Sequence, residues 1–375
     1  MDVHHLLILK ILRNNELTEV YAMMSLRAMA MSLISIFVPI YLYTLGYDIP
    51  TILLFFIIIS TTHAIFCPIS AKISSKMGFK HGMLISFIGY FLYFVMLATL
   101  PNNRVLFPIA VFYGIAQALF WVPFHAFFST LTDNKNRGEE VALLYIFPSI
   151  FSIAAPLIGG LIIFFAGFDV LFVVGLVLLM AAALPLFVSK DMRMPFSFSL
   201  RCDGFDKRVA ASLISYNDQM NSTLWPMFIF VIVGSIAALG GIVALGAIVG
   251  FATAWIIGKL CDKGHRKKML QFGAAGQFVL WILRAFASSL NHIISLESVW
   301  GVISKFKDVS YNSAYYEKAR KARRKLEFST LREMSIHIST ATIFCLIYVF
   351  YSHIGTPIIF FIAAVGAMFN ILIER

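Results

Sequence analysis

Long apolar runs recur along the whole chain and are separated by short polar segments. Each run is long enough for a helix that rises about 1.5 Å per residue to cross a hydrocarbon core roughly 30 Å thick. With 60% hydrophobic and only 13% charged residues, the chain has too little polar surface for a soluble protein. The sequence therefore predicts an all-α integral membrane protein. Twelve spans are expected, near residues 20–43, 51–71, 83–100, 106–131, 141–166, 170–188, 209–232, 236–260, 269–289, 293–316, 334–350 and 356–373.

The basic residues are distributed unevenly between the loops. If the N-terminus is cytoplasmic, 25 of the 30 lysines and arginines fall in cytoplasmic segments, and Arg104 is the only one outside the membrane on the other face. Such an asymmetry is the positive-inside rule. It predicts a multi-pass protein of the plasma (inner) membrane with both termini cytoplasmic. The net charge of +11 is then explained by topology, and no nucleic-acid partner is expected.

An internal repeat appears when the chain is aligned with itself at an offset of 187 residues. This offset pairs Pro39 with Pro226 and, without a gap, Lys76 with Lys263. One offset that holds through about half of the chain indicates a duplicated unit. We therefore expect two pseudo-symmetric six-helix bundles, residues 1–189 and 207–375, joined by a cytoplasmic linker at residues 190–206.

Two loop segments and one span carry a family signature. The segment Gly258 to Lys267 reads GKLCDKGHRK, and it resembles the loop motif of the major facilitator superfamily. The first-half copy, Ala71 to Lys80, keeps several of the same positions but has Ser75 in place of aspartate. In span five, a P-x-x-G-G sequence resembles the superfamily's antiporter motif. The resemblance covers nearly the whole chain, and it implies an alternating-access secondary transporter, usually monomeric, that needs no cofactor.

The resemblance also implies roles for these residues. The loop motif is expected to lock the two bundles together, with Asp262 engaging Arg137 to stabilise an outward-open state. A loop that fixes topology and caps a helix is the alternative. Because Ser75 has no charge, the matching lock on the other side is expected to be weak. The lock residues are Gly258, Asp262, Lys263, Arg266, Lys267, Lys76, Gly78 and Arg137, and the expected helix-packing residues are Pro156, Gly159 and Gly160.

Polar residues inside spans one, four, seven and ten mark the expected solute site. Ionisable groups within the bilayer are costly, and duplicated transporters bind near the midplane between their halves. Asp218 and Asp308 are candidate proton carriers, and Arg27 is either an anion-binding group or a partner for Asp218. The substrate- or proton-binding candidates are Arg27, Gln117, Trp121, His125, Asp218, Asn221, Trp225, Lys305, Asp308 and Asn312.

For several of these residues a structural role is the alternative. Lys305 and Asp308, three residues apart, are expected to pair, and this pair could serve packing alone. His125 could be an ordinary interhelical hydrogen bonder, and His63 and His337 are expected to be structural. With four scattered cysteines, no metal site is expected. Arg284 is expected to extend to the outer membrane interface.

Proton-coupled export of an amphiphilic small molecule is the function that these patterns favour. Uptake of an organic anion or metabolite through Arg27 and Lys305 is one alternative. A non-transporting sensor or scaffold, with Lys318 to Lys325 as its docking segment, is another. An enzyme is not expected, because the chain has no H-E-x-x-H or G-x-S-x-G sequence.

Overall fold

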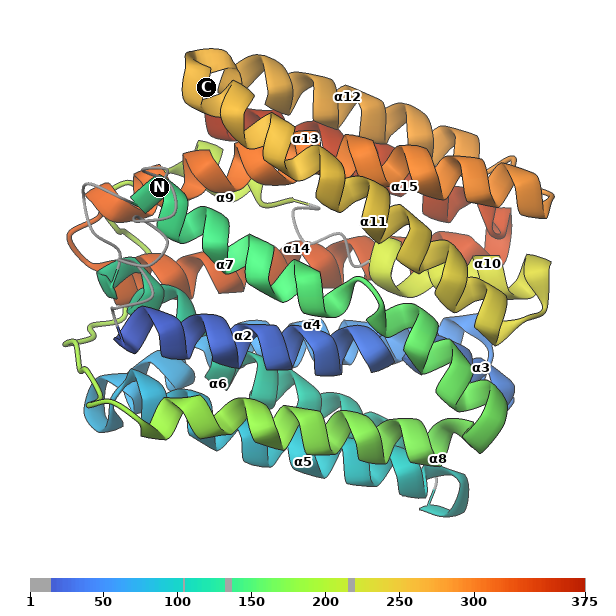
Figure 1. Cartoon of the computed structure of the whole chain (residues 1–375), viewed down its shortest axis with the longest axis horizontal. Coiled ribbons are helices and arrows are strands. Elements are labelled where there is room, and N and C mark those ends of the chain that lie inside the picture. The colour runs from blue at the N-terminus through green and yellow to red at the C-terminus, as the bar shows by residue number, and fades with distance from the viewer. Residues whose placement is uncertain (1–14, 104, 132–136, 215–219, 375) are drawn as a thin grey trace, which may run out of the picture.

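A computed structural model describes residues 15–103, 105–131, 137–214 and 220–374. Within these residues the secondary structure is helical apart from an isolated bridge between Cys202 and Phe205. The longer helices lie roughly parallel or antiparallel (Figure 1). The described α-helices, long and short, are α2 (Asn15–Ile34), α3 (Val38–Thr44), α4 (Ile49–Met77), α5 (Phe79–Asn103), α6 (Leu106–Leu131), α7 (Arg137–Ser152), α8 (Ala155–Ala183), α9 (Lys207–Ser212), α10 (Trp225–Val233), α11 (Ile236–Leu260), α12 (Arg266–Arg284), α13 (Leu290–Lys321), α14 (Lys325–Ile354) and α15 (Pro357–Met368).

The predicted twelve-span helical membrane fold is confirmed. Eight helical segments of the described chain are long and apolar enough to cross a membrane, and Met220–Val233 is a shorter apolar segment. One of the eight, Ile146–Phe187, contains two crossings, because the chain reverses at Gly167, whose φ of 82° suits glycine. The helices α12 and α13 complete the set, although charged side chains make both of them less apolar.

The repeat seen in the sequence reappears in the helix boundaries. Helix α3 begins at Val38 and α10 at Trp225, which are 225 − 38 = 187 residues apart. Helices α4 and α11 begin at Ile49 and Ile236, and 236 − 49 is again 187. We refer to α2–α8 as the N-terminal bundle and to α9–α15 as the C-terminal bundle.

The first span and its repeat, the seventh, are both interrupted. Helix α2 ends at Ile34 and α3 begins at Val38, and in the seventh span a π-helical turn, Met220–Leu224, precedes α10. Proline explains the position of both breaks. The ring nitrogen of Pro39 cannot donate to the carbonyl of Ser35, four residues earlier, and Pro226 stands in the same relation to Ser222. Interrupted helices at matching positions of two repeats are a common sign of a solute site.

Two helix pairs form the seam between the bundles. Helix α4 packs along α14, and α8 packs along α11. The second contact is very close, because a Cβ built on Gly160 would lie 2.9 Å from the backbone oxygen of Ile236. A Cβ on Gly240 would lie 2.3 Å from the backbone oxygen of Pro156. Small residues therefore allow the two backbones to approach.

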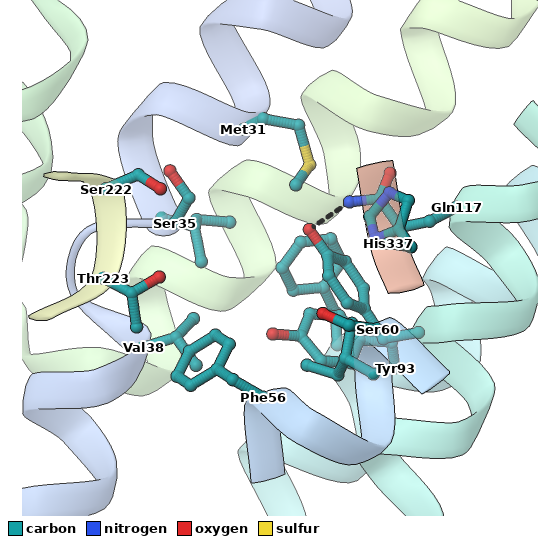
Figure 2. A pocket seen from close by; sticks show the side chains of 14 residues that line it. Met31, Ser35, Val38, Phe56, Ser60, Tyr93, Gln117, Ser222, Thr223 and His337 are labelled. Carbon is teal, nitrogen blue, oxygen red and sulfur yellow. Dashed lines mark hydrogen bonds between the residues drawn. The ribbon is translucent and has the colours of Figure 1, made fainter. Parts of the chain in front are cut away.

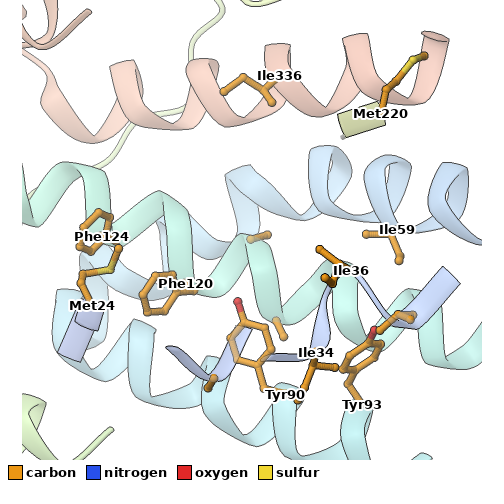
Figure 3. Close-up of a cluster of buried hydrophobic side chains, with 14 of the residues drawn as sticks. Met24, Ile34, Ile36, Ile59, Tyr90, Tyr93, Phe120, Phe124, Met220 and Ile336 are labelled. Atoms are coloured by element: carbon orange, nitrogen blue, oxygen red, sulfur yellow. The ribbon is translucent and has the colours of Figure 1, made fainter. Parts of the chain in front are cut away.

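An apolar core fills the N-terminal bundle and reaches the seam. Figure 3 shows Tyr90 and Phe120 beside α2, and it shows Ile336 of α14 facing this core from the other bundle. All three side chains are buried. The core holds the helices that carry the polar residues described below.

The segment between the bundles caps a helix at one end of the molecule. Asp191 accepts hydrogen bonds from the backbone N–H groups of Lys80 and His81, at 2.9 and 3.0 Å, and so caps the first turn of α5. The ammonium group of Lys80 also lies 2.6 Å from Glu19. We call this end, where residues 188–206 run, the linker end; it is on the left in Figure 1.

Candidate functional site

A cavity of about 60 Å³ lies where the broken first and seventh spans meet the seam. Ser35 lines it from the break in the first span, and Ser222 and Thr223 from the break in the seventh. Figure 2 shows these side chains on one side of the cavity and Gln117 and His337 on the other. Both bundles therefore contribute to the wall. The remaining lining residues are Met31, Ile34, Val38, Phe56, Ile59, Ser60, Tyr93, Phe94 and Tyr113.

Gln117 connects this cavity to Arg27. Its side-chain oxygen accepts hydrogen bonds from the guanidinium of Arg27 at 3.1 Å, the hydroxyl of Tyr90 at 2.7 Å and the indole of Trp121 at 2.9 Å. Three donors thus converge on one neutral oxygen. Its amide nitrogen donates to Tyr113, so that the whole side chain is held in one orientation.

Arg27 is enclosed by aromatic rings. Only 5% of the residue is exposed, and its guanidinium carbon lies 4.0 Å from the ring centre of Phe120 and 4.6 Å from that of Trp121. The guanidinium donates to Tyr90 and Gln117, while its Nε has no hydrogen-bond partner. No described carboxylate forms an ion pair with it, and the proposed partner Asp218 lies outside the described residues. Its charge therefore has no protein counterion among the residues described.

Arg284 is buried as well, but its charge is neutralised. Its guanidinium lies 3.0 Å from Glu297 and donates to Asn221 at 2.7 Å. The expectation that Arg284 reaches the membrane interface is wrong, because the side chain is fully buried. Three indole rings surround it at 4.1 to 4.6 Å from the guanidinium carbon, those of Trp225, Trp281 and Trp300.

This packed cluster changes the interpretation of two candidate binding residues. The indole N–H of Trp225 donates to Glu297 at 2.8 Å, and the amide oxygen of Asn221 is engaged by Arg284. Both residues therefore contribute to a buried ion-pair cluster within the C-terminal bundle. Neither is among the residues that line the cavity described above.

His125 belongs to a second polar cluster, at the seam. Its Nε2 lies 2.7 Å from Arg332 and 3.5 Å from Glu333, and its Nδ1 lies 3.3 Å from the hydroxyl of Tyr316. Arg332 is buried in α14 and pairs with Glu333. The charge of Arg332 is thus neutralised by a neighbouring carboxylate. His125, on α6, joins the two bundles through these contacts.

In span ten, three of the four charged residues lie together. Asp308 lies 3.9 Å from Lys305 and 3.2 Å from Lys307, so Lys307 joins the predicted pair. About a third of the Lys305 and Asp308 side chains is exposed, whereas Lys307 is buried. Asn312 donates to the backbone oxygen of Asp308 and is itself buried. Asp308 is therefore a partly exposed acid within this span, whereas Glu297 is buried.

Four residues of the predicted lock have surroundings that the structure does not describe. They are Arg137, Gly258, Asp262 and Lys263. Of the others, Arg266 pairs with Glu317 at 2.8 Å and with Glu374, both in its own bundle. Lys76 and Lys267 are exposed, and Ser75 donates to the backbone of Lys72 without reaching the other bundle. Gly78 has a φ of 113° and packs against Asp191.

The span-five glycines lie between two neighbours. A Cβ on Gly159 would meet the backbone oxygen of Leu33 at 2.4 Å, within the N-terminal bundle. Gly160, one position further, faces the C-terminal bundle. Pro156 is buried in the first turn of α8, where it needs no backbone N–H.

Sequence reasoning missed the most compact polar cluster of the seam. Glu333 is not among the predicted site residues, and His63 and His337 are expected to be structural, yet the three side chains lie together. The spacing of Glu333 and His337, four residues on one helix, places them on one face and was a usable signal. That His63 comes from the other bundle could be learned only from the fold.

These features define a class of protein: a helical membrane protein built of two bundles with a cavity between them. The model of the Major Facilitator Superfamily matches residues 20–196, and over these residues the chain is similar to this superfamily. This similarity to a family of transporters agrees with the expectation that the protein is not an enzyme. The comparison with curated protein sequences gave no match.

Solved transporter structures share the fold. The E. coli fucose:proton symporter FucP is similar with a TM-score of 0.66 and 14% identity, over 96% of this chain and 98% of that one. The human organic anion transporter MFSD10 (TETRAN) gives 0.67 and 12%, over 96% and 99%. The nucleoside transporter NupG gives 0.65 and 13%, over 96% and 97%. At these identities the likeness shows the fold alone.

Proposed function

We propose that this transporter carries a small organic anion with an apolar or aromatic body, and that Arg27 binds its negative group. The observation that supports this is the buried charge of Arg27, which has no ion-pair partner among the described residues, whereas Arg284 and Arg332 each pair with a glutamate. An unpaired buried charge is costly in a membrane protein. A substrate anion would offset that cost.

The route to Arg27 passes Gln117. A carboxylate oxygen at the position of the Gln117 oxygen would accept from the same three donors, Arg27, Tyr90 and Trp121. Hydrogen bonds to an ionised acceptor are roughly twice as strong as those to a neutral one. The anion therefore competes well with Gln117, and the aromatic and aliphatic cavity wall accommodates its body.

This geometry favours the organic-anion alternative over export of an uncharged amphiphile. The human neighbour MFSD10 is an organic anion transporter, which shows that a protein of this fold can carry such a substrate. We further propose alternating access as the mechanism, in which rocking of the bundles across the α4–α14 and α8–α11 contacts exposes the cavity to either face. The charge asymmetry of the loops supports cytoplasmic termini.

Ligand-dependent melting of the purified protein tests this proposal. Benzoate and other aromatic carboxylates are compared with their neutral amides, such as benzamide. We expect the carboxylates to raise the melting temperature and the amides to have little effect. Arg27→Gln should weaken carboxylate binding by about 10- to 100-fold, since a hydrogen bond to a charged group contributes about 1.5 to 3 kcal/mol.

A matched control is the exposed linker residue Lys190, because Lys190→Gln removes one positive charge far from the cavity. Arg27→Lys should bind with intermediate affinity, as lysine keeps the charge but not the planar donor pair. Equal stabilisation by amides and carboxylates, or equal loss of binding in Lys190→Gln, would contradict the proposal. Flux of radiolabelled benzoate in proteoliposomes then separates a transporter from a sensor, which carries none.

A further inference from the structure

Two stacked histidines and a glutamate meet at the seam, at the edge of the cavity. His63, on α4, and His337, on α14, lie with their ring centres 3.5 Å apart and their planes inclined by 18°. The Nε2 atoms of His63 and His337 lie 3.5 and 3.9 Å from Oε2 of Glu333. All three side chains are almost completely buried. The cluster thus joins one helix of each bundle.

Three of the four ring nitrogens of this cluster lack hydrogen-bond partners. Neither nitrogen of His63 has one, nor has Nδ1 of His337. Buried polar atoms are nearly always paired, so unpaired ones in a native fold need an explanation. Two imidazolium ions would repel one another at this ring distance, so the stacking fits uncharged rings. The uncharged imidazole is the form that binds metal ions.

We propose that His63, Glu333 and His337 bind a divalent first-row transition metal ion such as Zn²⁺, and that the ion links the two bundles. Their ligand atoms all lie within 4.8 Å of one another. A tetrahedral ion with bonds of about 2.1 Å holds its ligand atoms roughly 3.4 Å apart, so modest side-chain rotations close the site. Two imidazoles and one carboxylate are a donor set that suits Zn²⁺ and its neighbours.

The surroundings of Glu333 orient it for this role. Its Oε1 faces Arg332 and His125, which leaves Oε2 directed at the two histidines. Such outer contacts commonly hold a metal ligand in position. Because Arg332 already neutralises the glutamate, a bound divalent ion carries excess positive charge. A hydroxide ion would offset part of that charge and take the open position of the ion.

An entry path also exists. His337 lines the cavity, and so does Ser60, three residues before His63 on the same helix (Figure 2). An ion that enters the cavity therefore reaches the site without unfolding of the seam. Since α4 and α14 belong to different bundles, the bound ion should hold them in the present arrangement.

Cobalt provides a direct test, because Co²⁺ bound by nitrogen and oxygen ligands in a protein site has a characteristic visible absorption. We expect purified protein to bind one Co²⁺ per chain and Zn²⁺ to displace it. His63→Gln and His337→Gln should each weaken binding by about ten-fold or more. His81→Gln is the control, because His81 is an exposed histidine at the linker end.

Melting without metal shows whether each variant is folded, and Zn²⁺ should raise the melting temperature of the wild type but not of His63→Gln. The proposal is overturned if the wild type binds Co²⁺ no more tightly than His63→Gln, or if His81→Gln removes the absorption. Benzoate binding, measured on the same His63→Gln protein, should be unchanged. The metal site and the anion site can therefore fail independently.

Discussion

Single charged residues in this chain have very different roles, depending on what surrounds them. Glu317 illustrates this outside the membrane spans, at the linker end of α13. It accepts hydrogen bonds from Lys321 at 2.9 Å and from Arg266 at 2.8 Å. These bonds lower the pKa of Glu317 from 4.5 to about 2. The carboxylate therefore ties α12 to α13 only while it is ionised.

The lowered pKa of Glu317 predicts how stability responds to acid. A depressed pKa contributes stability above the unfolded value of 4.5, and this contribution is lost as the pH falls toward 2. Glu317→Gln should therefore melt at a lower temperature than the wild type at neutral pH, by a small amount because the pair is partly exposed. The difference should shrink as the pH falls below about 4.5. Melting curves at a series of pH values check this, and a difference independent of pH would refute it.

At the scale of helices, close packing through glycine determines which elements can move apart. Gly160 lies against the backbone of Ile236 in the other bundle, whereas its neighbour Gly159 lies against Leu33 in the same bundle. A methyl group at either position forces the backbones apart, at a cost of about 1 to 3 kcal/mol. The two substitutions are matched in chemistry but differ in which contact they strain.

Gly160→Ala should therefore shift the protein toward conformations in which α8 and α11 separate. Spin labels at Leu45 and Phe286, exposed residues of the two bundles, would report a longer mean distance, with Cys261 and Cys345 replaced by serine. Gly159→Ala should instead lower the melting temperature without that change in distance. If the distance distribution of Gly160→Ala matches that of the parent protein, the packing argument is wrong.

At the scale of the whole molecule, coupling to protons needs an acid that both faces of the membrane can reach in turn. Asp308 is the candidate that the described structure retains, because it is partly exposed and lies near two lysines. Asparagine has nearly the same size but cannot exchange a proton. Asp308→Asn should therefore abolish benzoate accumulation driven by a pH gradient and leave benzoate exchange largely intact.

Proteoliposomes with an imposed pH gradient provide the measurement for Asp308→Asn. The exposed linker residue Asp203 supplies the control, since Asp203→Asn also removes one carboxylate. Unchanged gradient-driven accumulation in Asp308→Asn would remove Asp308 from the coupling mechanism. Loss in both variants would point to a general effect of charge.

The sequence by itself determined the class of fold, because the length of apolar runs and the repeat at 187 residues are one-dimensional properties. The paired Pro39 and Pro226 even mark where two spans are broken. It also located Arg27, Gln117 and the accessible Asp308, since charged or amide groups inside a span stand out against apolar neighbours.

Only the tertiary structure decided which polar residues meet. Trp225 and Arg284 are separate features in the sequence, but they form one buried cluster with Glu297. His63 and His337 are far apart in the chain and meet only because α4 packs along α14. The physical reason is that hydrophobicity and helix periodicity act along the chain, whereas ion pairing and metal coordination depend on atoms that packing between helices brings together.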